Sequence, residues 1–271
     1  MKLSYPIATP EVRAAILGAK GAPGEILPAL RDAGYAAIEP FVGDPNAFDS
    51  AAWITAVQRS GLAVAALGTG PVVFDHQLTF TDPDASVRQA AITRAKTIVD
   101  LAAHLGTQVN IGKLRGDLAA GDAAQTSRDW MRAAFTDVCA YAAARGVVVT
   151  LEPQNRTIIN NLNTTAESLT WLRDLALPNL KLMLDVFHMD HEREDIAASL
   201  SAARDVLLHV HYADSARRAP GDGDFDFVAI TRALRAIGYN RAITVEIKQE
   251  PDVLTAARRS ATFLLPLLNP S

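Results

Sequence analysis

The sequence predicts an α/β fold, a single (β/α)8 TIM barrel over residues 1–271. Short apolar segments alternate with longer segments of helical periodicity along the whole chain, and no linker or low-complexity tract divides them. Eight such apolar segments give about 34 residues per strand-plus-helix unit, which is typical of a βα repeat, and barrels of this kind commonly occupy roughly 250 residues. A G-x-G-x-x-G loop, which would favour an open doubly wound sheet, does not follow the first segment.

The expected strands are short aliphatic runs, because the strands of a parallel barrel are buried on both faces. In chain order they are Lys2–Ile7, Ala36–Phe41, Leu62–Leu67, Gln108–Ile111, Val147–Glu152, Leu180–Asp185, Val206–His211 and Ala242–Ile247. The segments between them place apolar residues three or four positions apart, as helices do. The expected helices are Glu25–Ala33, Asp84–His104, Ser127–Arg145, Thr165–Leu175, Asp195–Ala203, Phe227–Ile237 and Asp252–Leu268.

Composition and charge exclude several classes of protein. A hydrophobic fraction of 49% supports a large core and excludes disorder of the whole chain. The single cysteine excludes an internal disulfide and a cysteine-rich metal site, and it is typical of a reducing compartment. A net charge of −4 argues against nucleic-acid partners, and no stretch reaches the roughly 18 apolar residues of a membrane span. We therefore expect a cytoplasmic enzyme with neither a nucleic acid nor a membrane as its partner.

Polar residues interrupt the apolar pattern near the ends of the last four expected strands. In these strands the other polar residues lie two positions from the terminal one, as Thr150 and His209 do, or four, as Lys181 does, and the opposite parity is aliphatic. Side chains two apart share one face of a strand, so the polar ones are expected to point into the barrel. Active sites of such barrels lie at the carboxyl ends of the strands. Four side chains are therefore expected to meet there, namely Glu152, Asp185, His211 and Glu246.

Three carboxylates and one imidazole in one place predict a metal site. Carboxylates that share a partly desolvated pocket raise one another's pKa unless a positive charge compensates them. One divalent cation is the simplest compensation, and this donor set suits Mn²⁺, Mg²⁺ or Co²⁺, and less naturally Zn²⁺. The alternative is that each residue is a strand-end charge bonded to a neighbouring loop. That alternative can explain a single position, but it does not explain the shared parity of four.

Other polar residues have more than one interpretation. His188 lies three residues beyond Asp185, in a segment expected over the barrel mouth, where it could bind substrate, move a proton or bond to the backbone. His209 lies one layer below the strand-end histidine and is expected to support it or to pack in the core. Glu39, at the end of the second strand, and Lys113, just past the fourth, could contact substrate or form loop ion pairs.

Four segments of the chain together resemble a known superfamily. They are Leu151–Arg156, Met183–Met189, His209–Gly223 and Thr244–Glu246. Through them the chain resembles the xylose-isomerase-like TIM-barrel superfamily of sugar isomerases and epimerases, most closely the ketose 3-epimerases of the D-tagatose and D-psicose type. The resemblance covers the C-terminal half through these motifs and the N-terminal half only through the βα rhythm.

The resemblance implies roles for individual residues. Glu152 and Glu246 are implied to be an acid/base pair on opposite sides of one carbon. His188 and Arg217 match positions that hold substrate oxygens, although Arg217 could equally be a surface arginine. The residues implied to hold a catalytic metal, commonly Mn²⁺, are Glu152, Asp185, His211 and Glu246.

One position departs from the pattern of these epimerases. They have a second glutamate after the Glu-x-x-Asn-Arg segment, where it contacts the terminal hydroxyls of the sugar. Here the segment Thr157-Ile158-Ile159 has no glutamate, and Ile158 takes that place. A free ketohexose is therefore less clearly implied as the substrate.

The implied reaction is 3-epimerisation of a ketose or a related keto-sugar. A cation that binds a ketone and the adjacent hydroxyl acidifies the C–H between them, so a carboxylate can remove that proton and leave a cis-enediolate. Return of a proton to the opposite face epimerises the carbon, and return to the neighbouring carbon is aldose–ketose or hydroxypyruvate isomerisation.

Other functions remain open on the same scaffold. Loss of a β-hydroxyl from the enediolate would make the protein a metal-dependent dehydratase (lyase) of keto-polyols, similar to inosose dehydratase. A DNA-repair enzyme similar to endonuclease IV is disfavoured by the acidic charge and the few histidines. A non-catalytic barrel would bind no metal. Because such barrels often associate, we expect a homo-oligomer, either a dimer or a tetramer.

Overall fold

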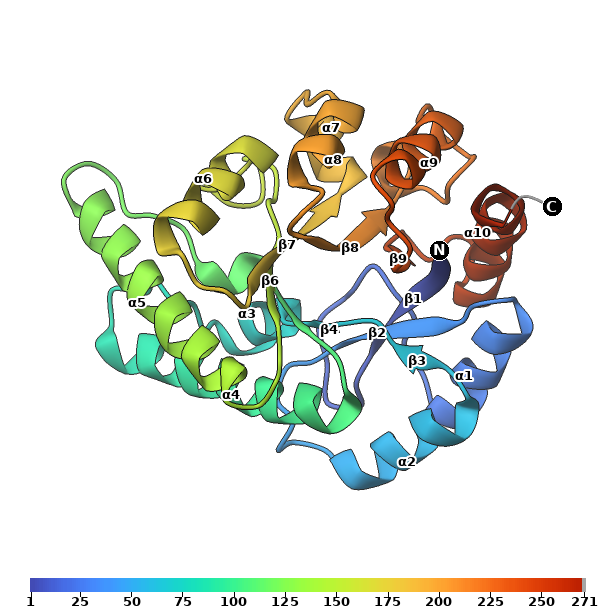
Figure 1. The fold of residues 1–271 in the computed structure, drawn as a ribbon. Coiled ribbons are helices and arrows are strands. Elements are labelled where there is room, and N and C mark those ends of the chain that lie inside the picture. The colour runs from blue at the N-terminus through green and yellow to red at the C-terminus, as the bar shows by residue number, and fades with distance from the viewer. Residues whose placement is uncertain (270–271) are drawn as a thin grey trace.

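The computed structural model describes residues 1–269 and shows a ring of parallel strands surrounded by helices (Figure 1). Around the sheet the strands follow the order β1-β9-β8-β7-β6-β5-β4-β2-β3, and a further pairing of β1 with β2 closes the ring. The predicted (β/α)8 TIM barrel is therefore confirmed. The strands are β1 (Lys2–Ala8), β2 (Ala37–Phe41), β3 (Ala63–Val64), β4 (Leu67–Gly68), β5 (Val109–Ile111), β6 (Val149–Leu151), β7 (Leu180–Asp185), β8 (Leu207–Tyr212) and β9 (Ala242–Val245).

One of the eight positions in the barrel wall is occupied by two short strands. β3 pairs with β2, whereas β4 pairs with both β2 and β5, so the nine segments fill eight positions. The sequence predicted one continuous strand here, Leu62–Leu67. Between the two segments the N–H of Ala65 still donates to the carbonyl of Ile38 at 2.8 Å, so the chain follows β2 throughout.

Helices cover the outside of the ring, and shorter ones lie at its mouth. Two short helices that the periodicity did not predict, α3 and α7, begin at the carboxyl ends of β4 and β7. The helices are α1 (Pro23–Asp32), α2 (Ser50–Ser60), α3 (Gly70–His76), α4 (Ala85–Leu105), α5 (Ala123–Ala143), α6 (Thr165–Leu175), α7 (Val186–His191), α8 (Ile196–Ala203), α9 (Phe227–Ala236) and α10 (Val253–Leu268), with 3-10 turns η1 (Lys113–Arg115) and η2 (Ser215–Arg217). Within residues 1–269, no helix is long and apolar enough to cross a membrane.

Hydrogen bonds across the barrel interior confirm that the polar residues point inward. Glu39 on β2 accepts hydrogen bonds from His209 and His211 on β8, although β1 and β9 lie between these strands in the ring. The intervening aliphatic residues, such as Leu182 and Val210, belong to the hydrophobic core between the sheet and the helices. The inside of the barrel is therefore polar toward its mouth, and the apolar core lies outside the ring.

Candidate active site at the mouth of the barrel

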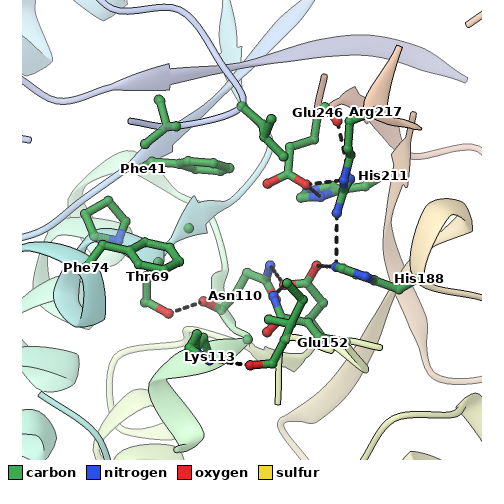
Figure 2. Close-up of a pocket in the computed structure, with 18 of the residues that line it drawn as sticks. Phe41, Thr69, Phe74, Asn110, Lys113, Glu152, His188, His211, Arg217 and Glu246 are labelled. Atoms are coloured by element: carbon green, nitrogen blue, oxygen red, sulfur yellow. Dashed lines mark hydrogen bonds and ion pairs between the residues drawn. The ribbon is translucent and has the colours of Figure 1, made fainter. Parts of the chain in front are cut away.

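A cavity opens at the carboxyl ends of the strands, and five of the six predicted site residues line it (Figure 2). Asp185, the sixth, lies at the end of β7 and is only 1% exposed. The parallel register places Asp185 beside His211 of the neighbouring strand β8, so the two side chains reach the same level. The five predicted residues that line the cavity are Glu152, His188, His211, Arg217 and Glu246.

The predicted ligand residues converge on one point. One potential ligand atom from each of Glu152, Asp185 and His211 lies within 4.8 Å of the other two. The Oε2 atom of Glu246 lies 3.6 Å from Nδ1 of His211, at the edge of this group. On the other side, Oε2 of Glu152 accepts from the Gln154 amide at 3.1 Å, so its position is fixed. The structure therefore brings together all four residues that the strand-end pattern predicted.

Glu39 orients the histidine of this group. Nε2 of His211 lies 2.8 Å from Oε2 of Glu39, and Nε2 of His209 lies 2.7 Å from the same oxygen. A carboxylate can only accept, so Nε2 of His211 carries a proton and its Nδ1 faces Glu152, Asp185 and Glu246. This buried Nδ1 has no hydrogen-bond partner among residues 1–269. An oriented imidazole with a free nitrogen aimed at carboxylates is the arrangement a divalent metal requires.

Glu39, His209 and His211 form a second group, in which one potential ligand atom of each residue lies within 4.8 Å of the other two. Its N···O distances of 2.7 and 2.8 Å are those of direct hydrogen bonds, and His209 also lies 3.0 Å from the Thr244 hydroxyl. We interpret this group as the support of His211. His209 therefore has the supporting position expected for it. Glu39 pairs with the two histidines inside the barrel, and in the part of the chain that the structure describes it forms no loop ion pair and does not line the cavity.

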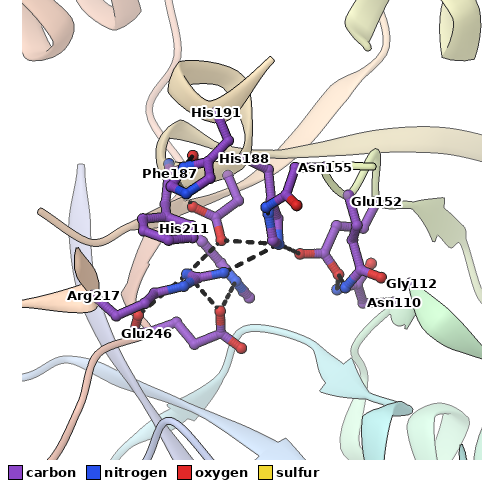
Figure 3. A network of polar contacts seen from close by, with 12 residues as sticks. Asn110, Gly112, Glu152, Asn155, Phe187, His188, His191, His211, Arg217 and Glu246 are labelled. Atoms are coloured by element: carbon purple, nitrogen blue, oxygen red, sulfur yellow. Dashed lines mark hydrogen bonds and ion pairs between the residues drawn. The ribbon is translucent and has the colours of Figure 1, made fainter. Parts of the chain in front are cut away.

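Arg217 is the buried cation of the site. Its Nη1 lies 2.7 Å from Oδ2 of Asp185 and 2.8 Å from Oε2 of Glu246, and the guanidinium packs over the Phe187 ring at 4.1 Å (Figure 3). Only 8% of the residue is exposed, so it is not a surface arginine. The side chain is well placed to hold anionic oxygens beside the carboxylates.

The loop that carries Arg217 is held by a single carboxylate. Asp214 is fully buried and accepts from four backbone N–H groups of residues 215–225 at 2.8–3.1 Å. At Gly223 an added Cβ would lie 2.2 Å from Oδ1 of Asp214, so this approach requires glycine. The loop passes through left-handed backbone at Ala216 and Arg217, with φ of 59° and 60°. Asp214 therefore compensates a strained turn that aims the guanidinium inward.

His188 lies between the two sides of the cluster on α7, which starts directly after Asp185. The Asp185 carboxylate caps this helix by accepting from the N–H of Phe187 at 2.9 Å. Burial and the neighbouring charge of Arg217 hold the pKa of His188 well below its usual range, so the ring is neutral. Its Nε2 accepts from Nη2 of Arg217 at 3.0 Å and lies 3.9 Å from Oε1 of Glu152. A neutral His188 can therefore accept a hydrogen bond through Nε2 at the cavity surface.

The carboxylates of the cluster are only partly compensated by Arg217. Burial raises the pKa of Glu152 to about 8; the positive charge of His211 opposes the rise, and Glu246 and Asp185 add to it. Burial also disfavours the charged form of His211, but Glu39 and Glu246 outweigh it and hold the pKa of His211 well above its usual range. The cluster thus retains protons that a divalent cation would displace, so its charge balance fits a metal site.

Comparison with known proteins agrees with this geometry. The sequence profile of the xylose isomerase-like TIM barrel family matches residues 27–267. The chain belongs to this family. The chain is similar in sequence to a Methylomonas sp. protein named L-ribulose 3-epimerase. The two are 35% identical over 231 residues, which cover 84% of this chain and 79% of that protein.

Two further relatives extend the comparison with the xylose isomerase-like family. A solved structure of an L-ribulose 3-epimerase superposes with a TM-score of 0.82 at 27% identity, covering 97% of this chain and 94% of that one. A 3-dehydro-D-guloside 4-epimerase of Escherichia coli is 38% identical over 125 residues, 45% of this chain and 47% of that protein. The predicted family and the predicted class of enzyme, an epimerase, are confirmed.

Sequence reasoning missed one residue that supports the site in this xylose isomerase-like barrel. Arg115, at the end of η1, is fully buried, and it donates all five of its N–H groups. The acceptors are neutral, so no charge pattern in the sequence marks the position. They are Oδ1 of Asn161 (3.2 Å) and the carbonyls of Gly112 (2.8 Å), Glu152 (2.8 Å), Asn161 (3.0 Å) and Leu162 (3.3 Å).

Lys113 lies at the edge of the cavity and forms the loop ion pair that was one of its two expected roles. Its side chain lines the cavity, and its ammonium group donates to the carbonyl of Ile158 and lies 3.9 Å from Asp117. Ile158 is 39% exposed and also lines the cavity.

Proposed function

We propose that this protein is a divalent-metal-dependent epimerase of a ketose or related keto-sugar, with epimerisation at carbon 3 as the principal candidate. The observation that carries the proposal is the buried Nδ1 of His211, which has no hydrogen-bond partner within residues 1–269 and which Glu39 aims at the oxygens of Glu152 and Asp185. In this proposal one metal ion, with Mn²⁺ preferred over Mg²⁺, Co²⁺ or Zn²⁺, is held by Glu152, Asp185, His211 and Glu246.

The bound metal would polarise the substrate carbonyl and lower the pKa of the adjacent C–H. Glu152 and Glu246 lie on two sides of the cavity, on separate strand ends, so one can remove a proton while the other delivers one to the opposite face (Figure 2). Arg217 would hold the developing negative charge on the substrate oxygens, and the neutral His188 would bind an adjacent hydroxyl. The Glu39 contact fixes His211 throughout these steps.

The relatives support this activity and its substrate class. The L-ribulose 3-epimerases act on a ketose, and the 3-dehydro-D-guloside 4-epimerase acts next to a keto group, so both names describe inversion beside a carbonyl. The proposal includes a cytoplasmic homo-oligomer, as expected from the composition and from the barrel scaffold.

Deuterium exchange tests the proposed function. Incubation of the Mn²⁺-loaded protein with a panel of ketoses and 3-keto-glycosides in D₂O should exchange a C–H next to the carbonyl, as followed by NMR. Glu246→Gln should abolish the exchange, whereas Glu25→Gln, on an exposed position of α1, should leave it unchanged. Exchange that survives Glu246→Gln would remove Glu246 from the mechanism. New enone or diketone absorbance in place of an epimer would identify a dehydratase.

A further inference from the structure

The cavity has two walls of opposite character. The carboxylates, His188 and Arg217 form one wall. Across from it, the rings of Phe41 and Phe74 face the cavity (Figure 2). Five further apolar residues line the cavity, namely Ala15, Ile16, Leu17 and Pro71, and Ile158 from the loop after β6. We call these seven residues the apolar wall.

The apolar wall contains large hydrophobic side chains that are exposed, whereas most such side chains of this protein are buried. Four large hydrophobic residues are exposed within residues 1–269, and two of them, Phe74 at 58% and Ile158 at 39%, line this cavity. A single exposed hydrophobic side chain needs no explanation, but a contiguous group beside a polar site marks a binding surface. The exposed faces of Phe74 and Ile158 are therefore available to an apolar group that enters the cavity.

Two of the polar groups next to the apolar wall already donate to backbone carbonyls. The Thr69 hydroxyl donates to the carbonyl of Asn110 at 2.8 Å, and the Lys113 ammonium donates to the carbonyl of Ile158. Sugar hydroxyls placed against this wall would give up hydrogen bonds to water without replacing them, which costs about 1–3 kcal/mol for each buried group. The wall therefore disfavours the free polyol end of an unsubstituted ketose.

The apolar wall is held in place before any ligand binds. Asp75, next to Phe74 on α3, accepts from the N–H groups of Arg13 at 2.8 Å and Ala14 at 2.9 Å, and so joins α3 to the loop that carries Ala15–Leu17. The ring of Phe41 packs directly on Gly68, where an added Cβ would lie 2.5 Å from the ring. A preformed surface of this kind binds an apolar group at little cost in conformational entropy.

We propose that the substrate is a keto-sugar that carries an apolar, preferably aromatic, substituent, which packs on the apolar wall while the keto-sugar lies against the carboxylates. This inference rests on the proposed function and names its substrate class. Glycosides with an aryl group belong to this class, and free ketohexoses do not.

The test compares phenyl and methyl 3-keto-β-D-glucopyranosides with free ketoses in the deuterium-exchange assay. The phenyl compound should exceed the methyl compound by about tenfold or more in kcat/KM, mainly through KM, because it buries a ring of apolar area. Phe74→Ala should bring this ratio close to one without lowering the thermal stability of the protein. Val228→Ala, at a position on α9 that is 49% exposed and outside the cavity, should leave the ratio unchanged.

Several outcomes would overturn the inference. A free ketose that exchanges as fast as the phenyl compound, or a phenyl-to-methyl ratio unaffected by Phe74→Ala, would show that the wall does not select the substituent. A change of oligomeric state in Phe74→Ala, measured by light scattering, would assign the wall to a subunit interface instead. If no compound exchanges, the proposed function fails, and the inference is then decided by ligand binding. Saturation-transfer NMR would compare the unreactive phenyl and methyl β-D-glucopyranosides. Preferential binding of the phenyl compound supports the inference, and equal binding refutes it.

Discussion

Replacement of Arg115 by lysine tests whether the buried guanidinium holds the loop behind Glu152. Arg115 is 0% exposed, and burial lowers its pKa only to about 10, so it is charged at neutral pH. Its five N–H groups all donate to neutral acceptors. Lysine keeps the charge but has only three N–H groups, so at least two of the five hydrogen bonds are lost. The Gly112 carbonyl keeps the backbone N–H of residue 115 as a donor, so at least one buried acceptor is left unsatisfied. At about 1–3 kcal/mol for each unsatisfied group, Arg115→Lys should lower the free energy of unfolding by at least about 1–3 kcal/mol.

Urea-induced unfolding at pH 7 measures this loss through the fluorescence of the buried Trp53 and Trp171. The urea concentration at the midpoint should fall. The slope of the free energy of unfolding against urea concentration should stay constant, since the surface exposed on unfolding does not change. The matched control is Arg173→Lys, because the Arg173 side chain is 73% exposed and should cost less than about 0.5 kcal/mol. If Arg115→Lys unfolds within about 0.5 kcal/mol of the unmodified protein, the hydrogen bonds of Arg115 contribute little and the reasoning is refuted.

Three further predictions follow from the cluster. Glu39→Gln should weaken Mn²⁺ binding about 10- to 100-fold by calorimetry, because it loosens the orientation of His211; unchanged affinity would exclude that role. In the metal-free protein the pKa of Glu152 lies near 8, above its usual value, so the folded state binds an extra proton and the free energy of unfolding should fall as pH rises from about 5 to 8. Glu152→Gln should remove that slope in urea unfolding with a chelator present, and parallel curves would contradict the assignment. Asp214→Asn should lower kcat more than it raises KM, because Asp214 positions Arg217 without touching the cavity; an effect on KM alone would argue against this role.

The barrel and most of the candidate site were predictable because they depend on local pattern. Strands buried on both faces give continuous aliphatic runs, and a polar residue that interrupts such a run at a fixed parity must point inward. Glu152, Asp185 and His211 could therefore be placed together from the sequence alone. The division of the third strand position into β3 and β4 was not predictable, because Leu62–Leu67 is uniformly apolar and carries no sign of the break.

The supporting residues were less predictable because their partners lie far away in the sequence. Glu39 meets His211 across the barrel, 172 residues along the chain, so only closure of the ring makes its role visible. Arg115 bonds mainly to backbone carbonyls, which every residue has. Phe74 lies on a helix too short to show a period. Such positions need the three-dimensional arrangement, whereas the strand-end residues needed only the sequence.

The two walls of the cavity come largely from different halves of the chain. The carboxylates, the histidines and Arg217 lie between residues 152 and 246, whereas all of the apolar wall except Ile158 lies between residues 15 and 74. Apart from Glu39, which supports His211, reaction chemistry and substrate selection are thus encoded in separate stretches of one gene. Substitutions at the wall positions between residues 15 and 74 should therefore change the substrate range without disturbing the metal ligands. Exchange of this stretch between related barrels, with Glu39 kept, is a direct route to enzymes with new specificity.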